Sequence, residues 1–388
     1  MDTSPIANNL RRLRREAGWN QADLAAAAGL SRSGYRNLER GHSGEPRMAS
    51  LRALAECLGV AVQDLLAPGA ELSRVRFRSL KRLKSREWIL DRVARWLRDF
   101  SELEAVTGEA CALELEPLWK AFPDFGFGRI PEFAGHARAA LGLGEREAVL
   151  DICGLLEARG IKILSQPLAS DAFMGLSVGA EEPGGPAVVV NTWERLPVET
   201  WIFSAAHELG HLLMHLQAYD IAEQAEDEDQ EREADRFASH FLMPEAAFRR
   251  EWAETAGLSL LDRVFKVKRV FRVSWRTVVY RVAEDLPKEE RPDLWARINR
   301  AHQKREGHPL LKHSEPQGIE AEIYDSLYAE RPTGREPFQL SPYDFQEDRL
   351  ARLVRIALEQ GAITLSRAAE ILGLSLSDMR KLTASWVA

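Results

Sequence analysis

The chain contains 388 residues, 45% of them hydrophobic and 29% charged, with a formal net charge of −7. This indicates a globular chain of two or three domains, and no apolar run reaches the roughly 18 residues that a membrane span needs. Residues 1–30 lack a secretory leader pattern, and the scattered Cys57, Cys111 and Cys153 exclude a disulfide framework and a cysteine metal cluster, so a soluble protein of the reducing cytoplasm is expected.

The charge is divided unevenly along the chain. Residues 1–100 hold 19 Lys and Arg against 11 Asp and Glu, a balance of +8, which leaves −15 for the remainder. A basic N-terminal segment on an acidic body is expected if only that segment meets nucleic acid, although a solvated basic face has the same charge. Charge alone does not decide between a nucleic-acid-binding segment and a solvated basic face, so a motif is needed.

Residues 1–68 are expected to form a compact all-α domain, because four or five short helical periods alternate there with glycine-containing turns. The tight turn Ala28-Gly29 separates a helix that begins near Asn20 from one capped by Ser31, which predicts a helix-turn-helix. The expected inward residues are Leu10, Leu13, Leu24, Ala25, Tyr35, Leu38, Leu51, Leu54 and Leu58.

This stretch resembles the XRE (Cro/repressor-like) family, because "QADLAAAAGLS" and "LERG" match the family patterns Q-x-x-L-A-x-x-x-G-L-S and L-E-R-G in register. The resemblance implies that the third helix enters the major groove of double-stranded operator DNA. The first residue of the second helix would hold a phosphate, and exposed residues of the third would face bases or the backbone. The residues concerned are Gln21, Arg32, Ser33, Arg36 and Asn37. A helical adaptor with ordinary exposed polar residues is the alternative.

Residues 69–130 are expected to form a basic, amphipathic helical connector. Basic residues stand among apolar ones from Ser73 onward, and an apolar helix face follows. That face consists of Ile89, Leu90, Val93, Trp96 and Leu97. The connector could extend the DNA footprint or a dimer contact, or pack on the second domain, and no site is assigned to it.

Residues 131–312 change character and indicate a second domain with a small sheet. A helix is expected over "EREAVLDICGLLEARG", ending at Gly160, and the β-rich segments "IKILS", "AFMGLSV" and "AVVVN" follow. The last of these is either an edge strand, beside which an extended peptide could be added, or an internal strand. A buried helix then begins near Pro197.

That helix carries the segment "SAAHELGHLLMHL". His207 and His211 are one turn apart and project from the same side, so both imidazoles can share one ion, while Glu208 lies about 100° around the helix and can reach a water. A chance H-E-x-x-H is expected only about once in 50 such chains. The alternative is a pair of core histidines satisfied by hydrogen bonds.

The segment "EREADRFASHFLMP" is the candidate source of the third ligand that a zinc hydrolase needs. Glu231 is expected to bind the ion, and Asp235, one turn on, to orient a ligand histidine. Glu233 is the rival ligand, although it points about 200° away from Glu231 on a helix. His215 is interpreted as a pocket or packing residue, because the glycine turn of the pattern H-E-x-x-H-x-x-G-x-x-H is missing.

Together "AAHELGHLLMH", "EREADRFASHFLMP" and "FRVSWRTVVYRV" resemble the ImmA/IrrE family of metallopeptidases, in which fusion to an XRE domain also occurs. The resemblance implies a thermolysin-like zinc endopeptidase that often cleaves a repressor to release phage, mobile-element or stress-response genes. In the corresponding mechanism Zn²⁺ polarises the scissile carbonyl and Glu208 is the general base. The acidic stretch "AEQAEDEDQE" departs from the family pattern and bears on how open the cleft is.

Residues 313–388 are expected to form a helical, helix-turn-helix-like module after a polar, proline-containing stretch. Thr364 and Ser375 would cap two helices joined at Gly373. The expected inward residues are Leu365, Ala368, Ala369, Leu372 and Leu376. A nearly neutral balance favours a protein or dimer contact, or packing on the peptidase, over a second DNA reader.

The sequence therefore predicts a mainly helical α+β protein: an all-α DNA-binding domain, a connector, a zincin domain and a helical C-terminal module. Its expected partners are operator DNA, a repressor as protein substrate and a second copy in a homodimer, without a membrane. A regulator with an active zinc peptidase competes with a non-proteolytic XRE-type repressor whose metal domain senses a ligand or partner. Intact Glu208 favours the peptidase.

Overall fold

The computed structural model describes residues 5–42, 46–60, 62–66, 72, 75–77, 86–216, 227–311, 314–316 and 339–386. The chain divides into two compact units, one made of Met1–Leu72 with Lys84–Arg95 and the other of Ser73–Leu83 with Trp96–Ala388. No helix within the described ranges has the length and apolar character to cross a membrane. The polar stretch expected after residue 313 lies mostly outside the described residues.

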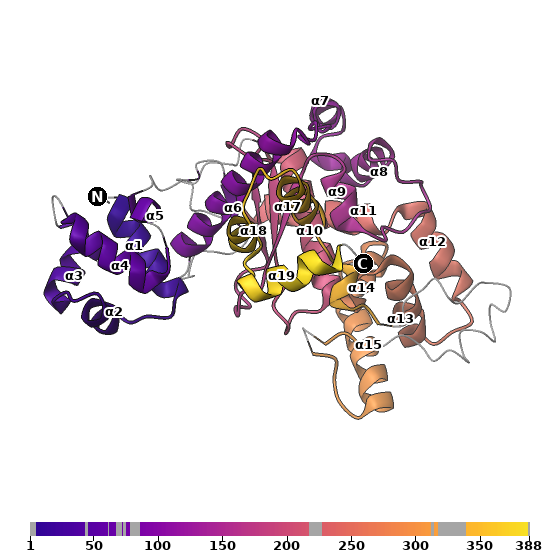
Figure 1. The fold of residues 1–388 in the computed structure, drawn as a ribbon. Helices are drawn as coiled ribbons and strands as arrows, with labels where there is room; N and C mark the ends of the chain where they lie inside the picture. Colours follow the sequence, from indigo (N-terminus) through magenta and orange to yellow (C-terminus); the bar gives the residue numbers. More distant parts are fainter. Residues whose placement is uncertain are drawn as a thin grey trace. The chain divides into compact units, whose positions relative to one another are not determined.

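The described elements of the first unit are all helices, as predicted (Figure 1). Its helices are α1 (Pro5–Glu16), α2 (Gln21–Ala27), α3 (Arg32–Glu39), α4 (Met48–Leu58) and α5 (Val62–Leu66). The side chain of Asn20 accepts two backbone N–H bonds at the start of α2, and Ser31 accepts one at the start of α3. Of the nine inward positions predicted, eight are buried and Leu58 packs partly buried against the same core. The helix-turn-helix is thus α2–α3.

Within the described residues, the second unit contains a four-stranded sheet in the order β1-β3-β4-β2. Its strands are β1 (Val75–Phe77), β2 (Lys162–Gln166), β3 (Gly175–Val178) and β4 (Ala187–Asn191). β4 pairs in parallel with β2, and β3 runs antiparallel to both β4 and β1. The three predicted strands are present, and "AVVVN" is an internal strand.

β1 corrects the prediction of a wholly helical connector. The segment reads Val-Arg-Phe, and alternation of apolar and polar residues suits a strand with one face on a core. Val75 is buried, and the strand pairs with residues about one hundred positions further along the chain, a distance that local pattern analysis does not span.

The helices of this unit follow the strands and the connector in chain order. They are α6 (Arg86–Thr107), within which the two units divide, α7 (Glu116–Phe125), α8 (Ile130–Ala140), α9 (Ile152–Glu157), α10 (Val198–Met214), α11 (Glu228–Leu242), α12 (Glu245–Glu254), α13 (Leu260–Phe271), α14 (Trp275–Glu284) and α15 (Arg291–Glu306). The helix expected from residue 145 begins only at Ile152, because the Asp151 side chain accepts the Gly154 N–H and caps it there.

α10 is the central helix of the second unit, and almost all of its residues are buried. It packs on β3 and β4 and also on α11, which in turn packs on α8. Gly210 makes the α10–α11 contact close, because a Cβ there would lie 3.0 Å from the ring of Phe237. The lack of a side chain at this position therefore sets the spacing of the two helices that carry the candidate site.

The C-terminal helices α17 (Arg349–Glu359), α18 (Leu365–Leu372) and α19 (Leu376–Ser385) belong to the second unit. Thr364 and Ser375 cap α18 and α19 as predicted, whereas Leu376 is 45% exposed and Met379 is buried in its place. The Arg349 side chain forms an ion pair of 2.5 Å with Glu104 of α6. Packing on the rest of the second unit, one of the alternatives for this module, is therefore what the structure contains.

Candidate metal centre and nucleic-acid interface

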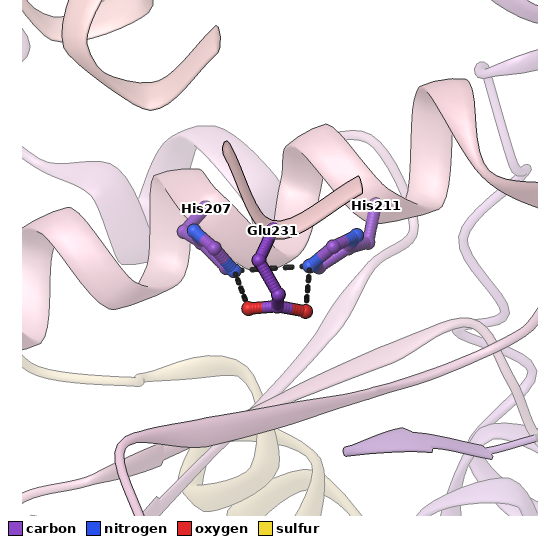
Figure 2. A group of neighbouring side chains, drawn as sticks. All are labelled: His207, His211 and Glu231. Atoms are coloured by element: carbon purple, nitrogen blue, oxygen red, sulfur yellow. Dashed lines mark hydrogen bonds and ion pairs between the residues drawn. The ribbon is translucent and has the colours of Figure 1, made fainter. Parts of the chain in front are cut away.

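Three side chains from two helices converge at one point (Figure 2). The Nε2 atoms of His207 and His211 lie 2.9 Å apart, and each is 3.3 Å from an oxygen of the Glu231 carboxylate. The two imidazoles project from α10 toward the carboxylate on α11. The structure thus brings together the three residues expected to bind zinc.

The donor set fits a tetrahedral zinc ion. Metal–ligand bonds of about 2.0 Å in a tetrahedron place the donors about 3.3 Å from one another, which matches the separations found here. Both histidines are almost completely buried, whereas the Glu231 side chain is 20% exposed. The site is therefore dry on the α10 side, with some access to solvent beside Glu231.

The protonation states of these groups also suit a metal ion, which binds neutral imidazole and ionised carboxylate. Burial lowers the pKa of His211 well below its usual value. Burial acts to raise the pKa of Glu231, but the neighbouring His207 and His211 outweigh it and lower that pKa. At neutral pH the donors are thus ready to bind a cation.

Asp235 lies where the sequence predicted, one turn after Glu231 on α11. Its Oδ1 atom is 2.7 Å from Nδ1 of His207. Because a carboxylate only accepts, Nδ1 of His207 carries the proton, and its Nε2 keeps the lone pair that faces the centre.

His215 and Glu233 orient the second histidine, a contact that the sequence interpretation missed. Nε2 of His215 lies 3.0 Å from Glu233, and Nδ1 of His215 lies 2.8 Å from Nδ1 of His211. Burial lowers the pKa of His215 to about 3, so its ring is neutral with one proton. That proton goes to Glu233, so His215 accepts from His211 and leaves Nε2 of His211 free for the ion. The i, i+4 spacing of His211 and His215 was the available signal.

We expect His215→Ala to weaken zinc binding by roughly tenfold, because the ring of His211 loses the partner that fixes its tautomer. A competition titration against a chromophoric chelator measures the change. Glu233→Gln should have a smaller effect in the same direction, and His136→Ala, an exposed histidine on α8, is the control. If His215→Ala bound zinc as tightly as the wild type, the contacts from Glu233 through His215 to His211 would play no part in zinc binding.

Glu208 is completely buried beside the sheet. The hydroxyl of Ser177 on β3 donates to its carboxylate at 2.7 Å. Gly175 of the same strand has no room for a side chain, because a Cβ would lie 3.1 Å from Glu208 and 2.9 Å from the carbonyl of Val189. β3 is therefore the strand that lies against Glu208.

Arg76 of β1 is a further residue at the centre, and the sequence analysis assigned it no role. Its guanidinium donates to Glu231 at 3.2 Å and to Gln230 at 2.5 Å, with 9% of the side chain exposed. Local sequence patterns do not reveal this contact. Arg76 and Glu231 are far apart in the chain, and they come together only because β1 pairs into the sheet.

A cavity of 740 Å³ adjoins the same region. Its walls include Asp235 and Ser239 of α11, Phe203 of α10, and Met174, the residue before β3. Helix α14 contributes Arg276, Thr277, Tyr280 and Glu284. This hollow is large enough for one or two amino-acid side chains and carries both acidic and basic groups on its walls.

In the first unit, α3 has one buried and one exposed face. Tyr35, Leu38 and Glu39 are buried in the domain. The residues expected to face bases or backbone lie on the exposed face, and they are Arg32, Ser33, Arg36 and Asn37. The exposed face is thus available to DNA.

Gln21, which is expected to hold a phosphate, has a partner within its own domain. Its amide Nε2 donates to Glu39 at 2.6 Å, and the same buried carboxylate accepts from Arg14 at 2.8 Å. A buried charge must be paired and hydrogen-bonded, which explains why both the glutamine and the glutamate are in the motif. The amide of Gln21 therefore helps to hold the buried Glu39 in place within the domain.

Comparison with known proteins follows the division seen in the structure. Residues 10–65 match the helix-turn-helix family model. The chain is also 38% identical over 66 residues to an uncharacterized HTH-type transcriptional regulator, y4dJ, of Sinorhizobium fredii, a match that covers 17% of this chain and 84% of that protein. The chain belongs to the helix-turn-helix transcriptional regulators.

The regulator carries a second recognisable domain. Residues 156–283 match the model of the IrrE N-terminal-like domain, peptidase family M78. The regulator thus joins an XRE-type DNA-binding domain to a metallopeptidase-like domain, as the two sequence resemblances implied. Such a domain implies a metal ion, and the histidine pair with Glu231 forms a possible site for it.

Proposed function

We propose that the regulator is a zinc-dependent endopeptidase that cleaves a repressor or another regulatory protein in a stress, phage or mobile-element response. The observation that carries this proposal is the position of Glu208. It lies next to the first histidine of the three-residue centre, is itself outside the donor set, and is held by Ser177. A site that only sensed a metal would not need a carboxylate there.

The chemistry follows from these side chains. A zinc ion bound by His207, His211 and Glu231 would supply a Lewis acid and activate a water molecule at neutral pH. Glu208 accepts the proton of the attacking water and passes it to the leaving amine. Asp235 holds His207 in the tautomer that the centre needs.

A peptide substrate would add to the sheet along β3, the strand that lies against Glu208, on the side where β1 pairs. An extended peptide binds a sheet by adding a strand at an edge, where main-chain groups supply affinity and side-chain pockets supply specificity. The cavity beside Asp235 begins at Met174, directly before β3, so it is suited to a side chain of such a peptide. In this arrangement residues 131–312 form the peptidase and residues 1–68 read the operator.

The function is tested by measuring zinc on the purified protein together with the fate of a co-expressed repressor. A metal assay should give about one zinc per chain. Cells that carry the regulator should lose the full-length repressor on induction, as seen on a blot, and a cell-permeable chelator should prevent the loss. A stable repressor in zinc-replete, induced cells would contradict a proteolytic role.

For the DNA-binding half, we expect Arg32→Ala and Asn37→Ala each to lower the ratio of operator to random-duplex affinity by roughly tenfold, because each would remove a contact to a base edge. Gel-shift titrations at fixed salt measure both affinities. Arg52→Ala, an exposed arginine on α4, is the control for loss of charge and should leave the ratio unchanged. Wild-type specificity in both variants would mean that other residues read the operator.

A further inference from the structure

The edge of β3 that a substrate would need is already paired. β4 covers one side of β3, and β1 covers the other in antiparallel register. Val75 lies opposite Val178, Arg76 opposite Ser177, and Phe77 opposite Leu176. A strand from the connector thus takes the place of an added peptide.

The central pair of that register, Arg76 and Ser177, contacts two different residues of the candidate site. Directly paired residues on neighbouring strands point to the same face of a sheet. Ser177 on this face donates to Glu208, while Arg76 donates to Glu231. One cross-strand pair therefore contacts the proposed general base and the proposed third metal ligand.

The charge of Arg76 opposes metal binding. Its guanidinium shares the Glu231 carboxylate with the two histidines, where a divalent cation would be attracted. A positive charge within ion-pair distance of a ligand repels the incoming ion and competes for the same oxygen. In the structure Arg76 is thus placed where it weakens the site and blocks the approach along β3.

The pairing of β1 with β3 is short, and the chain leaves the second unit on either side of it. β1 is three residues long, and the chain on both sides of Ser73–Leu83 continues into the unit that contains the DNA-binding helices. A strand of this length adds few hydrogen bonds, so a competing extended segment or a change in that unit can displace it.

We propose that β1 is a built-in occupant of the peptide-docking edge of β3, and that it keeps the metal centre closed through Arg76 until the strand is displaced. This inference rests on the proposed peptidase function. It also defines the chemistry of the competing segment: an extended peptide with a basic residue between two apolar ones, as in Val75-Arg76-Phe77.

Two variants and two binding measurements test the proposal on the full chain. Arg76→Gln removes the charge, and Arg76→Pro also removes a backbone donor from the strand. Arg355→Gln, an arginine paired on the surface of α17, is the matched control. Circular dichroism and thermal melting establish that each variant is folded, and Arg76→Gln keeps the test available if the proline variant is not.

The first measurement is zinc affinity by chelator competition. Arg76→Gln should bind zinc about tenfold more tightly than the wild type, because the repelling charge is gone. The second is binding of a fluorescent peptide with the sequence of residues 72–80. Arg76→Pro should bind it about tenfold or more tightly than the wild type, whose own strand competes at a high effective concentration.

Weaker zinc binding by Arg76→Gln would overturn the proposal and make Arg76 a residue that positions Glu231. Equal peptide binding by all variants would likewise show that β1 does not block a docking edge. Both measurements are repeated with Glu208→Gln, in which turnover is removed. If both measurements succeed while neither the wild type nor Arg76→Pro, in which the edge of β3 is open, cleaves any protein, the peptidase function fails and the occupied edge stands.

Discussion

Glu208→Gln is expected to lower proteolysis by roughly 10²–10⁴-fold while zinc content and operator binding stay at the wild-type level. Glutamine keeps the size of the side chain and much of its hydrogen bonding, including acceptance from Ser177, but it cannot take a proton from water. In cells with a reporter under the cognate promoter, the wild type should relieve repression on induction and the variant should stay repressed.

The matched control is Glu157→Gln, the same substitution at another buried glutamate. Glu157 accepts backbone N–H bonds from Asp348 and Arg349 and takes no part in the candidate site. The Glu157→Gln variant should cleave the repressor at the wild-type rate. Identical induction by wild type and Glu208→Gln, with intact repressor on a blot in both, would leave the non-proteolytic sensor as the function.

His207→Ala is expected to reduce zinc from about one ion per chain to a trace, because one of the three proposed protein ligands is lost. The stabilising effect of zinc should vanish with it, since an ion that binds only the folded state raises the melting temperature by mass action. Metal analysis after dialysis and melting curves with and without zinc measure the two effects.

His302→Ala provides the comparison, because His302 is also a buried histidine on a helix but bonds the carbonyl of His308. The His302→Ala variant should be less stable than the wild type and should keep its zinc. Equal zinc in the wild type and in His207→Ala would remove the metal centre from the account of this regulator, whatever the state of the DNA-binding domain.

The features that the sequence predicted well are those encoded within one helix or turn. The period of apolar residues and the caps Asn20 and Ser31 placed the helix-turn-helix, and the i, i+4 spacing of His207 and His211 placed two donors on one face. These patterns need no knowledge of distant partners, because the helix geometry alone brings the side chains together.

The features that it missed depend on contacts between distant segments. Arg76 and Glu231 meet through a strand pairing, and the Gln21 amide bonds the buried Glu39 within its own domain. Leu376 was expected inside, yet it is 45% exposed and Met379 is buried. Tertiary packing decides which of several apolar residues is buried and which polar residues bond each other. It therefore overrides the local pattern.

The close approach at Gly210 has a consequence for the choice of ion. The Phe237 ring leaves no room for a Cβ at Gly210, so the distance between the backbones of α10 and α11 is fixed near its minimum. That distance also fixes the separation of the histidine nitrogens from the Glu231 oxygens. Ions differ in bond length, from about 2.0 Å for zinc to about 2.4 Å for calcium, so this helix spacing selects by ionic radius and favours a small cation.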